Sequence, residues 1–483
     1  MLAKNSEYDV VIVGGGLSGM SAAAQAADQG LKALVIEKGR STGGSGNYVE
    51  GVFAVDSKMQ REQGIEINQA ELLHDEQEYS HYKANTKIWR EYIKQSAANI
   101  DWLKAKGVQF DNVATLGSGI DTWHLFSGLG NKAIHAGLEP FAREHGVEII
   151  KSATVTDLVI GKDKQVTGVK VQDFESNTVA TIMAKAVIIA TGGYLNNQKM
   201  LAKYFNENAN RIVPVNSGKN TGDGLTMAWK AGAKQFGLGM AMMFGGQIKE
   251  SAVPSYQYWK SDLGIASAEQ APLWVNEIGE RFVKENVFDN WAHAGNAIIR
   301  QERVYAILDQ GIIDKFTNGS LPRSLKPLST KTKLANLPKM LTEAVDKKRS
   351  FITKADSVAE LANQIDLPEL ATTVKAYNHA CEQGQDLDFE KPVQYLTSVS
   401  QAPFYAIELG VGAYCTMGGL RVNERNEVLD ANGRKLAGLY AVGNDAAAVL
   451  VGNTYGVNVP GSEAGYCVYS GRVAVQMAEK YLS

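Results

Sequence analysis

The stretch YDVVIVGGGLSGMSAAAQAADQGLKALVIEK, residues 8–38, decides the fold. Its apolar run from Val10 to Val13 is typical of a strand that is buried on both faces. A glycine-rich turn follows at once, and then an alanine-rich segment from Met20 to Gln29 that predicts a helix. A second apolar run, Ala33 to Ile36, predicts the next strand. Strand, turn, helix and strand in this order predict the first βαβ unit of an α/β fold with a parallel sheet.

The turn in this unit has glycines at the spacing G-x-G-x-x-G. Gly14 permits the tight turn, Gly16 lets a pyrophosphate approach the backbone, and Gly19 lets the helix pack close to the strand. The helix N-terminus, at Leu17 and Ser18, adds free N–H donors and the positive end of the helix dipole. The pattern predicts a dinucleotide site, and the alternative is a strand–turn–helix that binds nothing.

Glu37 follows the second strand, 21 residues after Gly16. Its carboxylate can accept a hydrogen bond from a ribose 2′-hydroxyl and disfavours a 2′-phosphate, so NADP is not expected. Residues 38–47 are rich in glycine, serine and threonine and predict a loop with exposed N–H groups and hydroxyls.

The composition is that of a globular chain of two or three domains, with 483 residues of which 45% are hydrophobic. A net charge of -3 and scattered basic residues give no indication of nucleic acid or an anionic membrane as partner. The polar N-terminus and the absence of a long apolar run predict no signal peptide, no membrane span and a cytoplasmic location. The three cysteines are isolated, so neither an iron–sulfur cluster nor another metal site is expected.

Changes of character along the chain predict its domains. The first part continues as an α/β pattern, with a helical segment over 70–106 and a loop over 117–130. A middle part, in which 249–271 is expected to be a loop, differs in style, and the opening style then returns before a closing helix over 462–480. We therefore expect one nucleotide-binding domain built from both ends of the chain and one inserted domain. Their predicted limits are 1–238 and 414–483 for the former and 239–413 for the latter.

Short motifs accompany the opening turn along nearly the whole chain. In order they are Val11–Gly19, Glu37-Lys38 with Gly43-Gly44, Ala190–Gly193, Thr221–Gly224, Gly279–Val283, Thr416–Gly419 and Gly438–Gly443. As a set they resemble the flavoprotein-subunit superfamily of fumarate reductase and succinate dehydrogenase, which includes the 3-ketosteroid dehydrogenases. The resemblance implies a Rossmann-like FAD-binding domain of the glutathione-reductase type, with an inserted α+β capping domain.

The resemblance implies that FAD is the cofactor. Attachment is expected to be non-covalent, because residues 41–53 lack the histidine that the covalent-flavin members carry there. The final helix would aim its first N–H groups at the flavin O2 edge and stabilise the anionic reduced flavin. The residues expected to bind FAD are Gly14, Gly16, Leu17, Ser18, Gly19, Glu37, Lys38, Thr42, Gly43, Gly44, Ser45, Val155, Ala190, Thr191, Gly192, Asn216, Asp223, Gly443, Asn444, Ser462 and Glu463.

The sequence departs from fumarate reductases at the residues that clamp the dicarboxylate. Cys415 stands where the family has a histidine, and Asp289 stands where it has an arginine. The clamp arginine of the last loop falls on Thr454 or Asn458, depending on the direction of counting, and residues 239–249 lack the family's His-Pro-Thr stretch. Because unpaired carboxylates in a dry pocket cost several kcal/mol each, we expect that fumarate and succinate are not substrates.

Residues 443–456 are more similar to the ketosteroid dehydrogenase branch. There a loop tyrosine and a backbone N–H hold the substrate's ketone oxygen, and the counterparts here are Tyr455 and an N–H near Val459. Neutral donors aimed at a carbonyl oxygen stabilise the charge that develops on it. The loop is longer than in that branch, and the expected cap tyrosine is replaced by Phe288 or Asp289, which leaves the substrate open.

Four residues are candidates for the chemistry. Tyr455 is a candidate electrophile or proton donor, although a phenol with a pKa of about 10 needs a neighbour to act as a base, and the sequence names none. Tyr414 precedes Cys415, where the family places active-site groups. His124 is a candidate proton donor in a loop, and Glu285 matches the family's cap glutamate. The alternatives are a packed tyrosine, a capping histidine and a salt-bridged glutamate.

The function expected from the resemblance is an FAD-dependent oxidoreductase. It would interconvert C–C and C=C next to a carbonyl, as in ketosteroids and enones, by hydride transfer with flavin N5. Its partners would be a small carbonyl-conjugated substrate and an external electron donor or acceptor. The alternatives are a reductase of an unsaturated acid that is not a dicarboxylate, and a non-catalytic flavoprotein that carries electrons.

Overall fold

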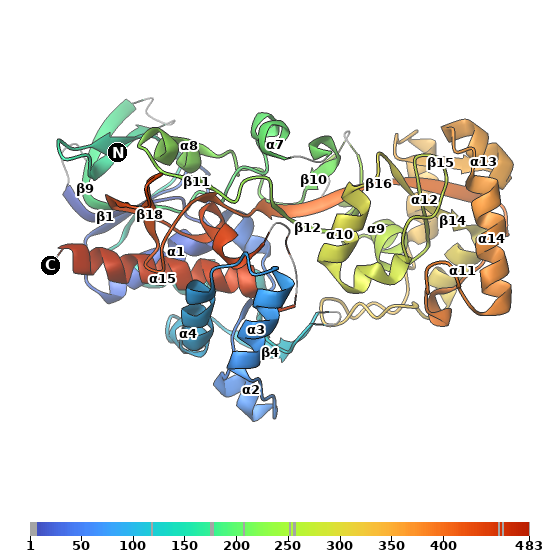
Figure 1. The fold of residues 1–483 in the computed structure, drawn as a ribbon, viewed down its shortest axis with the longest axis horizontal. Coiled ribbons are helices and arrows are strands. Elements are labelled where there is room, and N and C mark those ends of the chain that lie inside the picture. Colours follow the sequence, from blue (N-terminus) through green and yellow to red (C-terminus); the bar gives the residue numbers. More distant parts are fainter. Residues whose placement is uncertain are drawn as a thin grey trace. The chain divides into compact units, whose positions relative to one another are not determined.

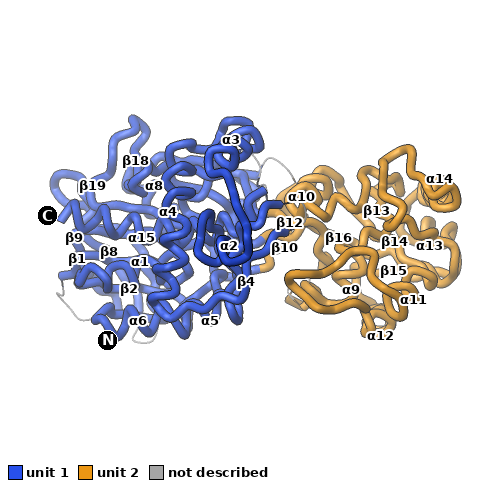
Figure 2. The backbone as a smooth tube through the Cα atoms, turned by 90° about the horizontal axis from the view of Figure 1, so that it is seen from below, with its two compact units in different colours: residues 1–205, 216–242, 414–483 blue, residues 206–215, 243–413 orange. Residues whose placement is uncertain are grey.

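A computed structural model describes residues 7–482 except 117–118, 174–177, 206–207, 251–252, 255–256, 453–454 and 456–457. The chain divides into two compact units, shown in different colours in Figure 2. Unit 1 comprises residues 1–205, 216–242 and 414–483, and unit 2 comprises residues 206–215 and 243–413. The domain limits expected from the sequence stay a prediction.

Unit 1 is built on a sheet whose central strands are parallel. The strand order is β18 (Glu427–Leu429), β19 (Lys435–Ala441), β9 (Thr178–Ile189), β1 (Glu7–Val13), β2 (Ala33–Ile36) and β6 (Glu148–Ile150), labelled in part in Figure 1. From β19 to β6 each neighbouring pair is parallel, whereas β18 is antiparallel to β19. Two further strands, β7 (Ala153–Ile160) and β8 (Val166–Asp173), extend β9 as an antiparallel ribbon. The first strand is buried on both faces, as its apolar run predicts.

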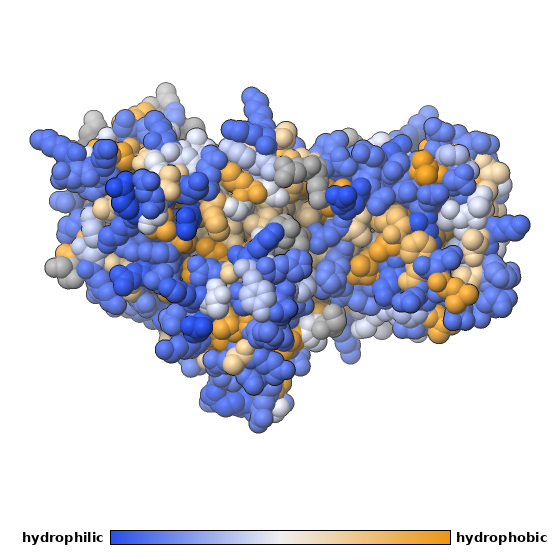
Figure 3. Space-filling model, in the orientation of Figure 1, coloured by the Kyte–Doolittle hydropathy of each residue, from blue (hydrophilic) through white to orange (hydrophobic). Residues whose placement is uncertain are grey.

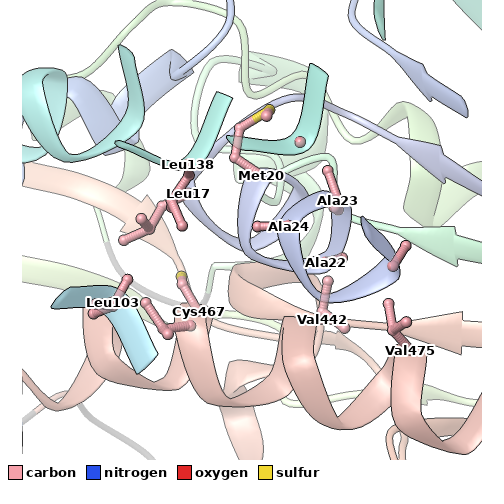
Figure 4. Packing of buried hydrophobic residues seen from close by; sticks show 14 of the residues in the cluster. Leu17, Met20, Ala22, Ala23, Ala24, Leu103, Leu138, Val442, Cys467 and Val475 are labelled. Carbon is pink, nitrogen blue, oxygen red and sulfur yellow. The ribbon is translucent and has the colours of Figure 1, made fainter. Parts of the chain in front are cut away.

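Two helices, α1 (Leu17–Asp28) and α15 (Ser462–Leu482), pack together in the core of unit 1. Figure 4 shows Ala22 of α1 facing Val442 and Val475, all fully buried. Small residues let the two backbones come close, since a Cβ at Gly471 would lie 2.5 Å from the Ser18 carbonyl oxygen. The alanines of α1 therefore serve close packing rather than helix propensity alone.

The remaining elements of unit 1 correct two expectations. The segment predicted as helical over 70–106 is two helices, because Ser80 to Asn85 form a turn and Asn85 caps the second helix. Trp123 and His124, expected in a loop, lie in strand β5. The elements are α2 (Lys58–Glu62), α3 (Gln69–Tyr79), α4 (Thr86–Ala105), α5 (Leu129–Lys132), α6 (Glu139–Glu144), α7 (Gln198–Tyr204), α8 (Asp223–Lys230), β3 (Gly51–Phe53), β4 (Phe110–Ala114), β5 (Trp123–Phe126), β11 (Gln235–Phe236) and β17 (Gly419–Leu420).

Unit 2 has its own sheet, centred on the long strand β16 (Phe404–Thr416). The strands on this sheet are β10 (Ile212–Pro214), β12 (Ala241–Ile248), β13 (Leu273–Asn276), β14 (Val304–Asp309) and β15 (Ile352–Ala355). The helices are α9 (Asp262–Gly264), α10 (Trp291–Ile299), α11 (Gln310–Asn318), α12 (Leu337–Asp346), α13 (Val358–Ile365) and α14 (Leu370–Gln383). The prediction of a loop over 249–271 is wrong in its second half, because helix α9 continues there as a π-helical turn over 265–269.

The surface shows how the chain meets water. On the face drawn in Figure 3, hydrophilic side chains predominate and hydrophobic residues form separate patches. Within the described ranges, no helix has the length and apolar character that a membrane crossing requires.

Candidate active site

The carboxyl ends of four neighbouring parallel strands meet at one edge of the sheet in unit 1. The strands are β19, β9, β1 and β2, and the predicted cofactor segments that follow them are 443–444, 190–192, 14–19 and 37–45. Ligands of parallel α/β sheets bind outside the carboxyl ends of the strands. The fold therefore gathers these segments, which lie up to 430 residues apart in the chain, at one edge.

The three motif glycines of the opening turn differ in the space around them. Gly14 has φ +107°, and a Cβ there would lie 2.3 Å from the Ala190 carbonyl oxygen. A Cβ on Gly19 would lie 1.9 Å from the Gly14 oxygen. Gly16 has φ −73°, which any residue adopts, and its nearest non-neighbour atom would be 3.9 Å away, on Gly43. Gly14 and Gly19 thus serve packing, whereas Gly16 leaves open the space that a phosphate needs.

Glu37 binds the turn directly. Its two carboxylate oxygens accept hydrogen bonds from the Gly15 N–H at 2.8 Å and from the Gly39 N–H at 2.6 Å. Strand β7 begins beside it, where the Ala153 N–H donates to the Glu37 carbonyl oxygen at 3.1 Å, and Val155 follows within that strand. The acid, the turn and Val155 are therefore neighbours, as expected for the adenosine end of the cofactor.

The next predicted residues form a polar chain. Lys38 Nζ is 2.6 Å from Asp223 Oδ2, so these two candidates form an ion pair. Ser45 Oγ donates to Asn220 Oδ1 at 3.0 Å, and Asn216 Nδ2 donates to the Tyr414 carbonyl oxygen at 3.1 Å. In the loop that joins Lys38 to Ser45, the Gly43 N–H donates to the Gly15 carbonyl oxygen, and Thr42 Oγ1 donates to the Glu139 carboxylate.

Asp445 holds the turn after β9, and the sequence analysis missed it. Its fully buried carboxylate accepts from the N–H groups of Thr191 (2.5 Å), Gly192 (3.1 Å) and Gly193 (2.9 Å), and from the Thr191 hydroxyl. Burial raises the pKa of Asp445, while these donors oppose the rise. Its position two residues after Gly443, at the end of a parallel strand, was the signal that could have identified it.

The polar groups at this edge of the sheet fit FAD. Within the described part of the chain, the side-chain oxygen of Asn444 is buried and has no hydrogen-bond partner, which suits a polar ligand at this edge. Ser462 and Glu463 begin α15, and the Ser462 carbonyl oxygen accepts from the Tyr92 hydroxyl at 2.8 Å. Together with the open space at Gly16, these residues could hold FAD, whose contacts with each of them stay predictions.

Tyr455 is buried, and several acidic side chains affect its phenol. Burial raises the pKa of its phenol well above the ordinary value, and Glu463, Cys415, Tyr79 and Glu76 raise it further. Glu463 is itself buried, which raises its pKa to about 7, and it accepts from Cys467 Sγ at 3.3 Å. The structure therefore supplies the acidic neighbours that the sequence did not name.

His124 is buried, with one ring nitrogen 2.6 Å from Ser57 Oγ and the other 3.0 Å from the Thr122 carbonyl oxygen. Burial lowers its pKa to about 4, so the ring is neutral at pH 7. Its role as a proton donor stays a prediction, and these contacts favour a structural role.

Glu285 lies in unit 2, within a buried ion network. Its carboxylate is 2.8 Å from Arg281 Nε and 3.0 Å from Lys391 Nζ, and Arg281 also pairs with Asp386 at 2.7 Å. A carboxylate so paired favours the salt-bridge alternative.

At the counted positions of the dicarboxylate clamp, the sequence has Cys415, Asp289 and Thr454 or Asn458 in place of histidine and arginine. Cys415 is buried with its sulfur 4.0 Å from Met242 Sδ, and Asp289 pairs with Arg323 at 3.1 Å. Thr454 lies outside the described residues, and Asn458 is half-buried. In the described ranges, no cluster of three or more His, Cys, Asp or Glu side chains is arranged to hold a metal ion.

Comparison with known proteins places the chain in a family. The family described as "FAD binding domain" matches residues 9–457, so the chain belongs to this family of FAD-binding proteins. The chain is 46% identical to a vinyl phenol reductase of Lactiplantibacillus plantarum, over 99% of this chain and 98% of that protein. It is 26% identical to an NADH:fumarate oxidoreductase of Klebsiella pneumoniae, over 94% of this chain but only 46% of that longer protein.

Among solved structures, the chain resembles a 3-ketosteroid delta1-dehydrogenase of Sterolibacterium denitrificans, with a TM-score of 0.79 and 19% identity over 98% of this chain and 99% of that one. This likeness bears on the fold alone. The expected superfamily, the α/β flavoprotein fold and FAD as cofactor are confirmed. The protein is an FAD-dependent oxidoreductase that acts on C–C and C=C bonds.

Proposed function

We propose that this enzyme reduces the C=C bond of a small, uncharged alkene conjugated to a hydroxylated aromatic ring, as in 4-vinylphenol. The observation that carries the proposal is the surroundings of Tyr455, a buried phenol whose pKa Glu463, Cys415 and Glu76 raise, with a cysteine at position 415 in place of the clamp histidine. A dicarboxylate placed there would be buried without the cations that the clamp supplies, whereas an uncharged alkene has no charge to pair. The whole-length similarity to a vinyl phenol reductase supports the same substrate class.

Tyr455 is the proposed proton donor. When bound and reduced by the external electron donor, FAD would supply the hydride. In 4-vinylphenol, a proton from Tyr455 adds to the terminal alkene carbon, and the ring hydroxyl stabilises the positive charge left on the carbon next to the ring, where the hydride adds. In an enone, the carbonyl-conjugated substrate expected from the sequence, the polarity would be reversed: the hydride would add to the β carbon, the carbonyl oxygen would take the negative charge, and Tyr455 would protonate the α carbon.

Apolar groups are proposed to form the wall of the substrate site in unit 1. Met240 and Cys415 are buried, and Met242 contacts the Cys415 sulfur. Thioethers adapt to a flat aromatic ring and make favourable contacts with it. Tyr414 is proposed to line this wall, since it precedes Cys415 and its carbonyl is fixed by Asn216.

The test is the reoxidation of the anaerobically reduced enzyme, followed by flavin absorbance after rapid mixing. We expect 4-vinylphenol to restore the oxidised spectrum. Styrene, which lacks the hydroxyl, should react at least about tenfold more slowly, because the ring oxygen no longer stabilises the charge. Fumarate should leave the flavin reduced, and fast reoxidation by fumarate would contradict the proposal.

A further inference from the structure

Glu76 is a buried acid that the established activity does not use. It lies on α3, and its side chain is only 7% exposed. In the part of the chain that the structure describes, its Oε1 atom is buried without a hydrogen-bond partner. An unpartnered buried carboxyl group is costly, so such a group invites a functional explanation.

The loop that carries Tyr455 is fixed on the corner between α3 and α4. The Asn85 N–H donates to the Val449 carbonyl oxygen at 2.7 Å, and Trp89 Nε1 donates to the Leu450 carbonyl oxygen at 2.8 Å. Gly452 touches the end of α3, because a Cβ there would lie 2.6 Å from the Ser80 carbonyl oxygen.

Glu76 is one helical turn before this contact, since the Ser80 N–H donates to the Glu76 carbonyl oxygen at 3.0 Å. The backbone contacts thus place Glu76 one helical turn from the point where Gly452 meets α3, and Tyr455 is three residues beyond Gly452. The electrostatic effect of Glu76 on the Tyr455 phenol agrees with this placement.

We propose that Glu76 returns a proton to Tyr455 after each turnover, an inference that rests on the proposed role of Tyr455 as proton donor. The substrate gains a hydride from reduced FAD at one alkene carbon and the Tyr455 hydroxyl proton at the other. The Tyr455 oxygen then takes the Glu76 carboxyl proton, and water restores the proton on Glu76. Two electrons pass to the alkene, and two C–H bonds replace its π bond.

Glu76 is better suited to this relay than Glu463. The Glu463 carboxylate already accepts from Cys467, whereas among the described residues the Oε1 atom of Glu76 has no hydrogen-bond partner. Burial, with a contribution from the neighbouring Asp75, raises the pKa of Glu76 to about 8, so the group carries a proton at pH 7. Asp75, which precedes Glu76 on the same helix, is exposed to water.

The test separates the first turnover from later ones, with 4-vinylphenol as the probe. In Glu76→Gln holoenzyme that has been reduced and equilibrated, Tyr455 starts protonated, so the first reoxidation should proceed within about twofold of wild type. Steady-state turnover should fall at least about tenfold, because Tyr455 is then reprotonated slowly. Glu76→Asp should restore part of the rate, and Glu71→Gln, an exposed position on the same helix, should change neither rate.

Unchanged steady-state turnover in Glu76→Gln would overturn the relay. An equal loss in the rate of the first reoxidation and in steady-state turnover would also overturn it, because such a loss indicates structural damage. If wild type itself does not react with 4-vinylphenol, the proposed function fails. The relay is then judged by infrared difference spectra across pH 8: a protonated-carboxyl band lost on raising the pH in wild type but missing in Glu76→Gln supports it, and no such band overturns it.

Discussion

At the scale of single residues, Tyr455 is the point on which the chemistry depends. The sequence identified it by resemblance, but could not name a base or acid beside it, because Glu76 is about 380 residues away in the chain. Only the fold brings α3 against the loop after β19. Buried acids such as Glu76 have no local signal, since a glutamate in a polar helix is ordinarily exposed.

Substituting Tyr455 by Phe removes the proposed proton donor and keeps the ring. We expect the rate of alkene reduction to fall by about 10²–10⁴-fold, the usual contribution of a general acid. The FAD content, measured by absorbance after purification, should not change. A variant that retains more than half of the wild-type rate would show that another group donates the proton.

The titration of Glu76 predicts how stability depends on pH. Because burial raises its pKa from 4.5 to about 8, the folded state holds this proton where the unfolded state has lost it. The contribution of this bound proton to the free energy of unfolding is therefore complete below pH 4.5. It is lost as the pH rises to 8, by up to about 1.4 kcal/mol per pH unit. Asp75 raises the pKa of Glu76 further, and Glu76, together with Glu463, Cys415 and Tyr79, raises the pKa of Tyr455.

Glu76→Gln should remove this dependence. We expect its Tm to exceed that of wild type by an amount that grows between pH 4.5 and pH 8, measured by thermal unfolding of both proteins in matched buffers. A Tm difference that stays constant over this range would mean that Glu76 does not titrate there.

At the scale of elements, the sequence predicted the opening turn and the parallel strands well. It did not predict the break between two helices or a short strand within an expected loop. The apolar runs of β1 and β2 identify buried strands from local pattern alone. The break between α3 and α4 depends on the Asn85 cap, which a helical periodicity does not reveal. Strand β5 forms because β3 and β4 pair with it on both sides, a non-local reason that its own sequence does not carry.

The glycines of the opening turn should separate folding from binding. Gly19→Ala places a Cβ 1.9 Å from the Gly14 oxygen, so it should push α1 from the turn and lower the Tm. Gly16→Ala has room within the protein and should leave the Tm of the FAD-free protein unchanged, but it should weaken FAD binding by filling the phosphate space. Thermal unfolding of the FAD-free proteins tests the first effect and titration with FAD tests the second, and equal behaviour of the two variants would contradict this division.

Asp445→Asn should loosen the turn after β9. The amide keeps one acceptor oxygen but turns its NH₂ toward backbone donors, so we expect a loss of about 1–3 kcal/mol in stability, read from denaturant unfolding. Asp430→Asn is the matched control, because Asp430 also accepts from backbone N–H groups but is partly exposed. Equal losses in the two variants would show that burial of the network is unimportant.

At the scale of the whole molecule, the family could be predicted because its motifs follow the strands along almost all of the chain. The substrate could not be predicted from the sequence, because substrate choice depends on which side chains the fold brings to Tyr455. The absence of the dicarboxylate clamp was the most informative negative sign, and the acidic surroundings of Tyr455 agree with it. Non-covalent FAD, the external electron donor and a cytoplasmic location stay predictions.

The most direct measurement is a competition under steady-state turnover. The enzyme, supplied with a chemical reductant under anaerobic conditions, receives equal concentrations of 4-vinylphenol and fumarate, and the products are separated by chromatography. The account predicts 4-ethylphenol in large excess over succinate. Succinate as the main product would contradict it.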